Sequence, residues 1–380
     1  TTASNNTAIG YSAMGANTVG TENVAVGHEA LTTNVDGSQS TAIGFQALYY
    51  QEPASAVDMN NTAVGYYAGR SINTGTLNTL VGANTGDAIT TGFDNVAMGR
   101  SALTTEDTGR KNVAIGSSAL EVQNSDADNF NTAVGFEAGK SVTTGTNNTF
   151  VGAEAGDATD DGVSNVAVGY AALSANCGSQ NTAIGKDALN PTTGASNTAV
   201  GMAAGVGITS GDNNLCLGVD AGRTSSPSGN ITTADNIICL GDDAITACHV
   251  EVDWSIGSDQ RDKTDFTALD LGLGFVNALA PVTYKWDKRS KYGDKHADDY
   301  DLNDQTPDGT HKEDWLDIGF KAQEVEALEI AAGYNKSNKT NLVASHSEDG
   351  KRMTLQYSKF IPILVKAVQE LSAEIDKLKA

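Results

Sequence analysis

The first two thirds of the chain repeat one short pattern, in which a polar residue precedes two or three small or β-branched residues and a glycine. The pattern reads NTAVG at Asn61–Gly65 and returns as NTAIG, NVAVG, NTLVG, NVAMG, NVAIG, NTFVG and, last, IICLG. There are fourteen such units, most of them 17 residues apart, with spacings between 16 and 23. A regular period of this length predicts a repeat protein in which each unit forms one coil.

The residues after each glycine keep a fixed phase and add a longer period. Three residues after the glycine comes alanine in thirteen of the fourteen units, with Thr85 as the exception. At the next position, large residues alternate with glycines, mostly in pairs: Met14, Leu31, Leu48, Gly69, Gly86, Leu103, Leu120, Gly139, Gly156, Leu173, Leu189, Gly205, Gly222 and Ile245. The alternation returns every four units, which indicates duplication of a four-unit block.

A unit of this length is too short for a helical hairpin and predicts one coil of a parallel β-solenoid. In the strand, Thr62 and Val64 point to one face and Ala63 to the other, before Gly65 forms the turn. Neither face is charged, so we expect one to fill the coil interior and the alanine face to lie against neighbouring chains. Stability should come from stacking and oligomerisation, because one coil cannot bury its apolar face alone. The leading asparagines should form turns or a stacked amide ladder.

After residue 257 the repeat stops and a different pattern begins. It predicts a helix over Thr267–Leu279, a strand over Pro281–Trp286, an acidic loop over 288–314, and a strand leading into a helix over Gly319–Leu328. The chain should therefore divide into a solenoid, residues 1–257, and a small α+β domain, residues 258–380. The predicted fold class is mainly β, with a C-terminal α+β region that ends in a helix.

That last helix carries a heptad pattern, which we call the seam. The seam residues are spaced alternately 3 and 4 apart and are Ile361, Leu364, Val368, Leu371, Ile375 and Leu378. An amphipathic helix packed on its own domain would show a broader apolar stripe, so a self-associating coiled coil is favoured. β-Branched residues alternating with leucine favour dimers, but the repeat region upstream leads us to expect a trimer.

Composition and charge exclude several classes of protein. Of the 41 glycines, 34 fall in residues 1–257, and that region has 25 acidic and 7 basic residues within a chain of net charge −23. A polyanion is repelled by phosphate backbones, so we predict no nucleic-acid partner. No apolar run of about 18 residues occurs, so no membrane insertion is predicted. The chain starts at Thr1 rather than at methionine, which predicts a fragment or a processed product.

Cysteine and acidic residues predict no metal site or cofactor. Cys216 and Cys239 replace the strand alanine and are interpreted as small core residues, while Cys177 and Cys248 lack a C-x-x-C partner. An acidic cluster in the 288–314 loop lacks the turn glycine and the final glutamate of an EF-hand, so we interpret it as a solvated loop. Its members are Asp298, Asp299, Asp301 and Asp304.

The NTAVG-type units over residues 5–245 resemble the head repeats of trimeric autotransporter adhesins and similar repeats of bacteriophage tail fibres. The resemblance implies parallel β-rolls assembled as homotrimers. Insertions interrupt the period near 49–58 and 224–235. The first brings tyrosines near those of the next unit, a candidate glycan contact that competes with ordinary loop packing. These are Tyr49, Tyr50, Tyr66 and Tyr67.

Residues 258–380 resemble the intramolecular chaperone domain of endosialidase-type phage tail spikes and fibres, through SDQRDK, LAPVTYKW, GFKAQEVE and YSKFIPILVKAVQEL in order. The resemblance implies a domain that trimerises, aligns three chains and then cuts itself off before the first serine. Here that bond is Gly257–Ser258, with Ser258 as nucleophile and Lys263 as general base.

The chemistry needs a lysine that can accept a proton. A serine hydroxyl is a poor nucleophile without a neighbouring base, and lysine serves as one near neutral pH only when burial or another cation lowers its pKa. Burial in the assembled trimer would make folding control cleavage. Asp262 departs from the apolar residue of the family motif and favours the ammonium form of Lys263. Asp259 and Arg261 are expected to form a structural ion pair.

These observations predict a trimeric phage tail fibre or appendage for host attachment, with a chaperone that releases itself by intramolecular serine autoproteolysis. Expected partners are two further copies of the chain, a host cell-surface glycan or protein receptor, and other tail proteins of the virion. The first alternative is a trimeric adhesin on the bacterial surface. The second is a glycan-degrading tail spike, which would need a pair of carboxylates in a cleft.

Overall fold

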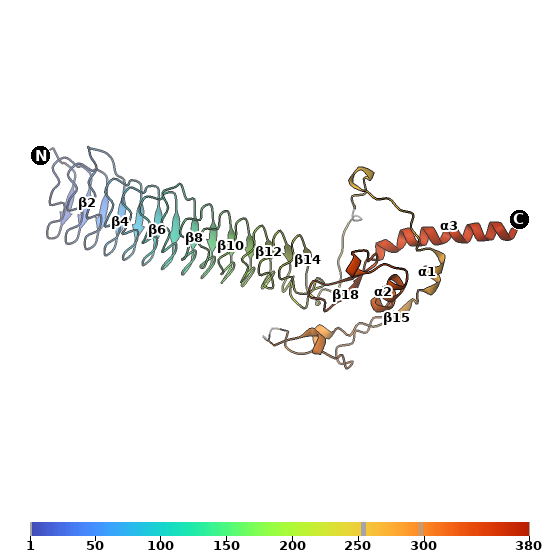
Figure 1. Ribbon diagram of the computed structural model, residues 1–380. Coiled ribbons are helices and arrows are strands. Elements are labelled where there is room, and N and C mark those ends of the chain that lie inside the picture. The colour runs from blue at the N-terminus through green and yellow to red at the C-terminus, as the bar shows by residue number, and fades with distance from the viewer. Residues whose placement is uncertain (1, 252–255, 296, 298, 380) are drawn as a thin grey trace. The chain divides into compact units, whose positions relative to one another are not determined.

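The computed structural model describes residues 2–251, 256–295, 297 and 299–379. The chain forms two compact units (Figure 1). The solenoid unit comprises Thr1–Ser226 and Ile231–Asp242, and the C-terminal unit comprises Pro227–Asn230 and Asp243–Ala380. The change of unit near Asp242 precedes the Gly257–Ser258 bond, and the domain boundary at that bond stays a prediction.

The repeats form one parallel sheet of fourteen three-residue strands in sequence order, as predicted. The strands pair in register, so that Thr62, Ala63 and Val64 lie beside Thr79, Leu80 and Val81. Their bounds are β1 Thr7–Ile9, β2 Val24–Val26, β3 Thr41–Ile43, β4 Thr62–Val64, β5 Thr79–Val81, β6 Val96–Met98, β7 Val113–Ile115, β8 Thr132–Val134, β9 Thr149–Val151, β10 Val166–Val168, β11 Thr182–Ile184, β12 Thr198–Val200, β13 Leu215–Leu217 and β14 Ile238–Leu240.

The glycine after each strand makes the closest approach between coils. Gly65 has φ +146°, and a Cβ placed on it would lie 2.2 Å from the carbonyl oxygen of Gly82. Any side chain at this position would collide with the backbone of the next coil, so only glycine fits. This contact explains why the glycine is kept in all fourteen units.

The central strand residues point into the coil, which corrects one prediction. Ala63 is fully buried, whereas Thr62 and Val64 are only partly buried. The expectation that the alanine face lies against neighbouring chains is therefore wrong. The reason is the narrow coil: Ala63 shares the interior with the buried Ala68, so that a small residue fits at this position in most coils, and the β-branched residues take the outer face.

The four-unit period reflects exchange of volume inside the solenoid. Where the interior strand position holds the larger Leu80, the same coil has Gly86 and the preceding coil has Gly69, and a Cβ on either glycine would lie 2.8 or 2.9 Å from a Leu80 methyl carbon. Phe150 stands in the same relation to Gly139 and Gly156. The duplicated block thus alternates which position of the coil supplies the bulk.

The asparagines that start the units form the predicted amide ladder. The Asn61 Oδ1 atom accepts a hydrogen bond from the backbone N–H of Asn78 at 3.0 Å, and Asn78 Oδ1 accepts one from the N–H of Asn95 at 3.2 Å. The Asn61 Nδ2 group donates to the carbonyl of Gly75 at 2.7 Å. Buried polar atoms are thereby paired from coil to coil.

The C-terminal unit contains three α-helices, two antiparallel strand pairs and short 3-10 turns among its described residues (Figure 1). Strand β15 pairs with β16, and β17 pairs with β18. Their core contains Leu271, Phe275, Val325, Val343, Phe360 and Ile363. The bounds are η1 Gln260–Asp262, α1 Leu273–Ala278, β15 Val282–Tyr284, η2 Arg289–Lys291, η3 Leu302–Asp304, β16 Asp317–Gly319, α2 Ala322–Ala331, η4 Lys336–Asn338, β17 Ala344–His346, β18 Met353–Leu355, η5 Tyr357–Lys359 and α3 Phe360–Lys379.

The predicted elements of this unit are found with different bounds. Helix α1 covers only the second half of the expected Thr267–Leu279 span, whose first half is not helical although Leu271 is buried in the core, and α2 continues three residues past Leu328. Helix α3 has two apolar faces: Phe360, Ile363 and Ala367 are buried, while the side chains of the seam are exposed. None of the described helices combines the length and the apolar character needed to cross a bilayer.

Candidate functional site

The structure places Ser258 beside Lys263. The Lys263 Nζ atom lies 2.6 Å from Ser258 Oγ and 3.4 Å from the Ser258 carbonyl oxygen, so the ammonium donates to both. The turn of η1 between them brings the two side chains together across five positions of sequence. The backbone N–H of Lys263 donates to the carbonyl of Gln260 at 3.2 Å and closes this turn.

An ion pair holds the turn from the other side. The Asp259 carboxylate accepts from the Arg261 backbone N–H at 2.9 Å and from Arg261 Nη2 at 2.6 Å, as expected of a structural pair. Hydrogen bonds from the Arg261 side chain and backbone hold the pKa of Asp259 below its usual value, and the same pair raises the pKa of Arg261. Both residues therefore stay charged, and their role is to fix the turn rather than to move protons.

The site is open to solvent in a single chain. Gly257, Ser258 and Lys263 are all exposed, and a Cβ on Gly257 would meet no atom within 4 Å. Asp262 is exposed as well, and no ion pair joins its carboxylate to Lys263, both of which the structure describes. A lysine acts as a base near neutral pH only when burial or another cation favours its neutral form. The pair thus has the distance for proton transfer but lacks the burial.

Comparison with known proteins assigns this part of the chain. Residues 258–334 match the model of the family described as Chaperone of endosialidase (Peptidase_S74). Residues 258–334 form a chaperone-of-endosialidase domain. The match begins at Ser258 and includes Lys263, α1, β15, β16 and α2. No curated protein and no solved structure matches the chain.

The candidate glycan contact is an aromatic cluster around Arg70. The guanidinium carbon of Arg70 lies 4.9 Å from the ring centroid of Tyr67, 5.4 Å from that of Tyr50 and 6.0 Å from that of Tyr49. The ring of Tyr66 lies 4.0 Å from Tyr67 and stacks on Phe45 at 5.4 Å. The structure thus gathers all four tyrosines but places Arg70 or another aromatic ring against each of them. A glycan contact at this cluster stays a prediction.

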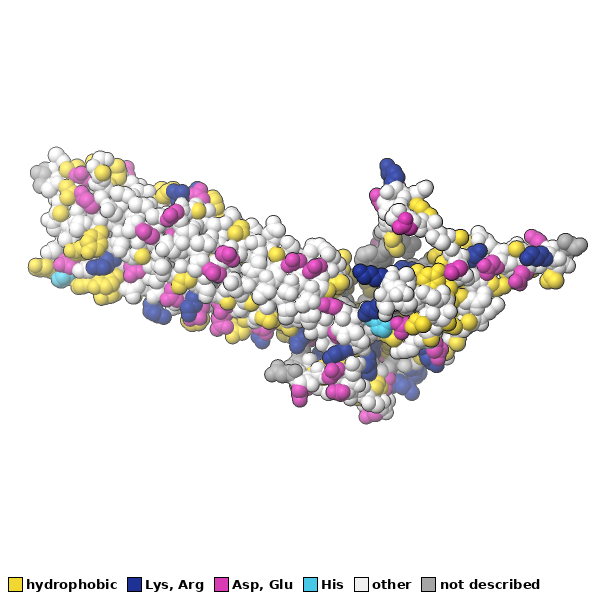
Figure 2. All heavy atoms as spheres, in the orientation of Figure 1, with side chains coloured by type: hydrophobic (Ala, Val, Ile, Leu, Met, Phe, Trp, Pro, Cys, Tyr) yellow, Lys and Arg dark blue, Asp and Glu magenta, His cyan; other side chains and the backbone are white. Residues whose placement is uncertain are grey.

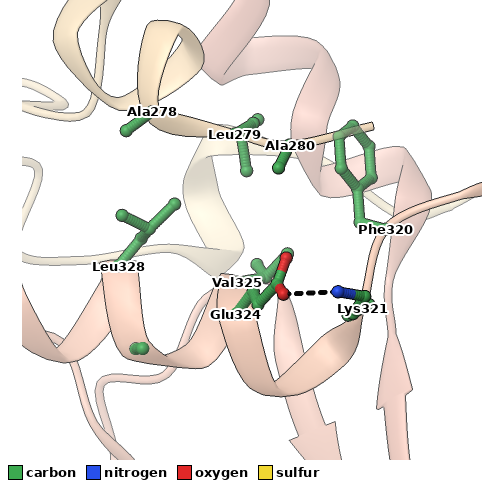
Figure 3. Close-up of a pocket in the computed structure, with 9 residues that line it drawn as sticks. Ala278, Leu279, Ala280, Phe320, Lys321, Glu324, Val325 and Leu328 are labelled. Carbon is green, nitrogen blue, oxygen red and sulfur yellow. Dashed lines mark hydrogen bonds and ion pairs between the residues drawn. The ribbon is translucent and has the colours of Figure 1, made fainter. Parts of the chain in front are cut away.

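The C-terminal unit also has a small pocket between the end of α1 and the start of α2 (Figure 3). Its volume is about 280 Å³, and its walls are mostly apolar, with Leu279, Phe320 and Leu328 pointing toward it. Glu324 is the acidic residue of the lining, and it is paired with Lys321 at 2.7 Å. The lining has no second carboxylate beside Glu324 and no hydroxyl or thiol side chain.

The described residues contain no group of three or more His, Cys, Asp or Glu side chains placed to hold a metal. Of the acidic cluster in the 288–314 loop, Asp298 lies outside the described residues. Asp301 pairs instead with Lys351 at 3.0 Å. Hydrogen bonds from the Asn303 backbone and the Lys351 side chain lower the pKa of Asp301.

The sequence did not single out four polar residues of the C-terminal unit that form hydrogen bonds between segments before and after Ser258. They are Asn230, Asp243, Ser290 and Asp349, each of which makes a hydrogen bond within that unit. Their only sequence signal is the insertion at 224–235, which breaks the repeat period immediately before the last strand.

Proposed function

We propose that the protein is a homotrimeric fibre, of the kind that phage tails use for host attachment, and that its C-terminal region assembles the trimer and then cuts itself off before Ser258. The chaperone-of-endosialidase domain supports the assembly role. The solenoid supports the fibre role, because parallel coils in register make an elongated rod without long loops.

The observation that carries the proposal is the seam of α3. Its six side chains stay exposed although the same helix buries Phe360, Ile363 and Ala367 in its own domain. Ile361, Leu364 and Val368 border an open apolar hollow of about 340 Å³. A continuous apolar stripe at heptad spacing is stable in water only when other helices cover it. Two further copies of the chain are the proposed cover.

The solenoid offers a second surface for the same partners. The third residue of every strand points outward and is aliphatic in all fourteen coils: Ile9, Val26, Ile43, Val64, Val81, Met98, Ile115, Val134, Val151, Val168, Ile184, Val200, Leu217 and Leu240. In eight of the fourteen strands this residue is exposed. Figure 2 shows hydrophobic side chains at intervals along one side of the solenoid. Such an uninterrupted uncharged row fits contact between chains better than contact with water.

Cleavage would follow from burial of the Ser258–Lys263 pair in the trimer. A neutral Lys263 amine accepts the Ser258 Oγ proton, and the oxygen attacks the carbonyl carbon of Gly257. The Gly257–Ser258 carbon–nitrogen bond breaks, Lys263 returns the proton to the departing nitrogen, and an ester joins Gly257 to Ser258 Oγ. Water hydrolyses the ester. The products are the 1–257 chain, which ends in the Gly257 carboxylate, and the 258–380 fragment, which begins with Ser258 and its restored hydroxyl. The chemistry is intramolecular and has no external substrate.

The test of assembly is a charge placed in the seam. Leu371→Asp puts a carboxylate at the proposed helix interface, where burying it unpaired is strongly unfavourable. Ala373→Asp adds the same charge at an exposed position outside the seam. Light scattering should give trimers for the wild type and Ala373→Asp, and monomers or aggregates for Leu371→Asp. Trimers from Leu371→Asp, or a monomeric wild type, would contradict the proposal.

Attachment to a host and a place in a phage tail rest on the resemblance of the repeats. Labelled trimers should bind whole cells of a susceptible host, and binding should be lost after enzymatic removal of the surface glycan or protein that serves as receptor. An adhesin of the bacterial surface would instead be found in the outer layers of the cell that encodes it.

A further inference from the structure

A turn in the C-terminal unit grips a segment of the last solenoid insertion. Pro227–Asn230 lies in the chain between β13 and β14 but belongs to the C-terminal unit. The Asp349 carboxylate, in the turn between β17 and β18, accepts from the backbone N–H of Asn230 at 3.1 Å. The same carboxylate accepts from Ser347 Oγ at 2.5 Å and from the Lys351 N–H at 3.0 Å, which hold it in place.

The fit at Gly229 is close. Its φ is +71°, and a Cβ placed there would lie 2.6 Å from Asp349 Oδ1 and 2.7 Å from Ser347 Cβ. The segment therefore passes against the turn with no space for a side chain. Burial alone would raise the pKa of Asp349, but the hydrogen bonds from Ser347, Lys351 and Asn230 outweigh it and lower that pKa. The carboxylate is thus ionised at neutral pH.

A second grip holds the chain just after β14. Asp243 and Ser290 are both buried, and Ser290 Oγ donates to the Asp243 carboxylate in a short hydrogen bond. Lys288 Nζ donates to the Asp243 carbonyl at 2.9 Å, and Lys295 lies 4.0 Å from its carboxylate. Two lysines and a hydroxyl thus converge on one residue that precedes the proposed cleavage site.

The two grips belong to one polar network. Arg289 Nη2 donates to the carbonyl of Lys351 at 2.6 Å, and so joins η2 to the turn that carries Asp349. Lys351 also pairs with Asp301 at 3.0 Å. The contacts to Asn230 and to Asp243 are therefore connected, because residues 288–301, which bind Asp243, are bonded to residues 347–351, which bind Asn230.

We propose that Asp349 and Ser290 form a latch on Asn230 and Asp243 that keeps the C-terminal fragment bound after the chain is cut. The proposal rests on the proposed cleavage before Ser258. Both gripped residues lie upstream of the Gly257–Ser258 bond and both gripping residues lie downstream, so hydrolysis of that bond breaks none of the latch contacts. The occupant of this surface is the chain's own last insertion and the residues after β14. Release is then a separate step, controlled by opening of the latch in all three copies.

The test measures dissociation of the cut chain. The purified cleaved protein is diluted, and separation of the 258–380 fragment from the 1–257 trimer is followed by size-exclusion chromatography. Asp349→Ala with Ser290→Ala removes both gripping groups, while Asp304→Ala with Ser337→Ala removes an aspartate and a serine at exposed positions outside the latch. The latch variant should release its fragment at least about tenfold faster than the wild type and the control.

A variant in the gripped segment separates loss of the latch from misfolding of the turn that carries Asp349. Gly229→Ala leaves that unit's turn unchanged but forces a methyl group against Asp349 and Ser347, and it should also speed release. Equal release rates in the wild type and both latch variants would overturn the proposal. The proposal would also be overturned if the 258–380 fragment of the wild type separated from the 1–257 trimer as soon as the bond is cut.

Failure of cleavage is distinguishable from failure of the latch. Intact mass reports whether the Gly257–Ser258 bond is cut, and chromatography reports whether the fragments stay together. If the wild type is uncut, a site for a specific protease inserted between Gly257 and Ser258 supplies the cut. The same comparison of release rates then tests the latch by itself.

Discussion

Phe150 occupies the space that a side chain at Gly156 would need. A Cβ built on Gly156 would lie 2.5 Å from Phe150 Cε1, and one on Gly139 would lie 2.8 Å from Phe150 Cδ2. In coils that carry leucine at the Gly156 position, such as Leu103 and Leu173, the strand residue of the same coil is alanine. No coil therefore carries a large residue at both positions, and Leu80 and Phe150 also fill the space beside the glycine of the preceding coil.

The first prediction exchanges the two sources of bulk. Gly156→Leu should prevent proper stacking of its coil, because the leucine and Phe150 would overlap in a close-packed interior. Phe150→Ala should lower the free energy of unfolding by about 3–5 kcal/mol through the cavity that it leaves. The double variant should be more stable than either single variant, as measured by the thermal midpoint of the β signal in circular dichroism.

Backbone strain does not account for this result. Leu103 and Leu173 adopt φ of 53° and 56°, close to the 61° of Gly156, so the chain already tolerates leucine in that conformation. Additive effects of the two substitutions would show that Phe150 and Gly156 do not share one volume.

The solenoid was predictable because its period is marked by a position that only glycine can occupy. The glycine spacing located all fourteen strands, since the Gly65 position admits no side chain. The alternation of Thr62, Ala63 and Val64 defined two faces but not which one is interior. That choice depends on the width of the coil, which is set by contacts between Ala63 and residues such as Ala68 and Leu80 and is not visible in a single strand.

The second prediction concerns the cysteines. Cys216 and Cys239 face each other across β13 and β14 in the buried interior. Burial and the neighbouring Cys239 raise the pKa of the Cys216 thiol to about 12, and burial raises the pKa of Cys177. Because the thiolate is the reactive form, only the exposed Cys248 should react quickly with a thiol reagent in the native protein.

Titration with such a reagent should give one fast thiol per chain, and three more only after denaturation. Cys216 should react roughly a thousandfold more slowly than a free thiol. In Cys248→Ser the fast phase should vanish. A second fast thiol in the native wild type would mean that the interior of the last coils opens readily.

The third prediction concerns Glu106, which is fully buried in the solenoid. Its carboxylate accepts from the backbone N–H of Gly109 at 2.7 Å and from the side-chain amides of Gln123 at 2.9 Å and Asn129 at 3.0 Å. None of these donors is positively charged. Burial therefore outweighs the hydrogen bonds and raises the pKa of Glu106 above its usual value.

A raised pKa means that the folded chain favours the protonated acid. Stability should fall as pH rises from about 4 through the raised pKa and stay lower above it, by about 1.4 kcal/mol for every tenfold gain in proton affinity on folding. Glu106→Gln removes this titration, so the difference in thermal midpoint between wild type and variant should change with pH over that window. Glu22→Gln, at an exposed position, should show no such change. A constant difference for Glu106→Gln would contradict the assignment.

Glu106 was hard to find because it is one polar residue in a repeat full of them. It lies three residues after Leu103, where three other leucine coils have the buried Asn34, Gln51 and Gln123 and one has the exposed Asn176. The phase of the repeat therefore contained a signal for burial. No such signal in the repeat marks the Ser258–Lys263 pair. A serine and a lysine five positions apart occur often by chance, and only the resemblance to the chaperone family singled them out.

The last prediction is self-cleavage controlled by assembly. Ser258→Ala removes the nucleophile and should leave folded trimers of full-length chains. Lys263→Ala removes the base, and Lys263→Arg supplies a guanidinium that keeps its proton near neutral pH, so both should stay uncut. The assembly variant Leu371→Asp should also stay uncut although its Ser258 and Lys263 are unchanged, because in one chain Lys263 is exposed and donates to Ser258. Intact mass of each purified variant reports the outcome.

Asp262→Leu places an apolar residue beside Lys263, as in the family motif, and should raise the rate of cleavage in the trimer. If Leu371→Asp is cut as fast as the wild type, burial in the trimer does not control the reaction. If Lys263→Arg is cut, Lys263 is not the base.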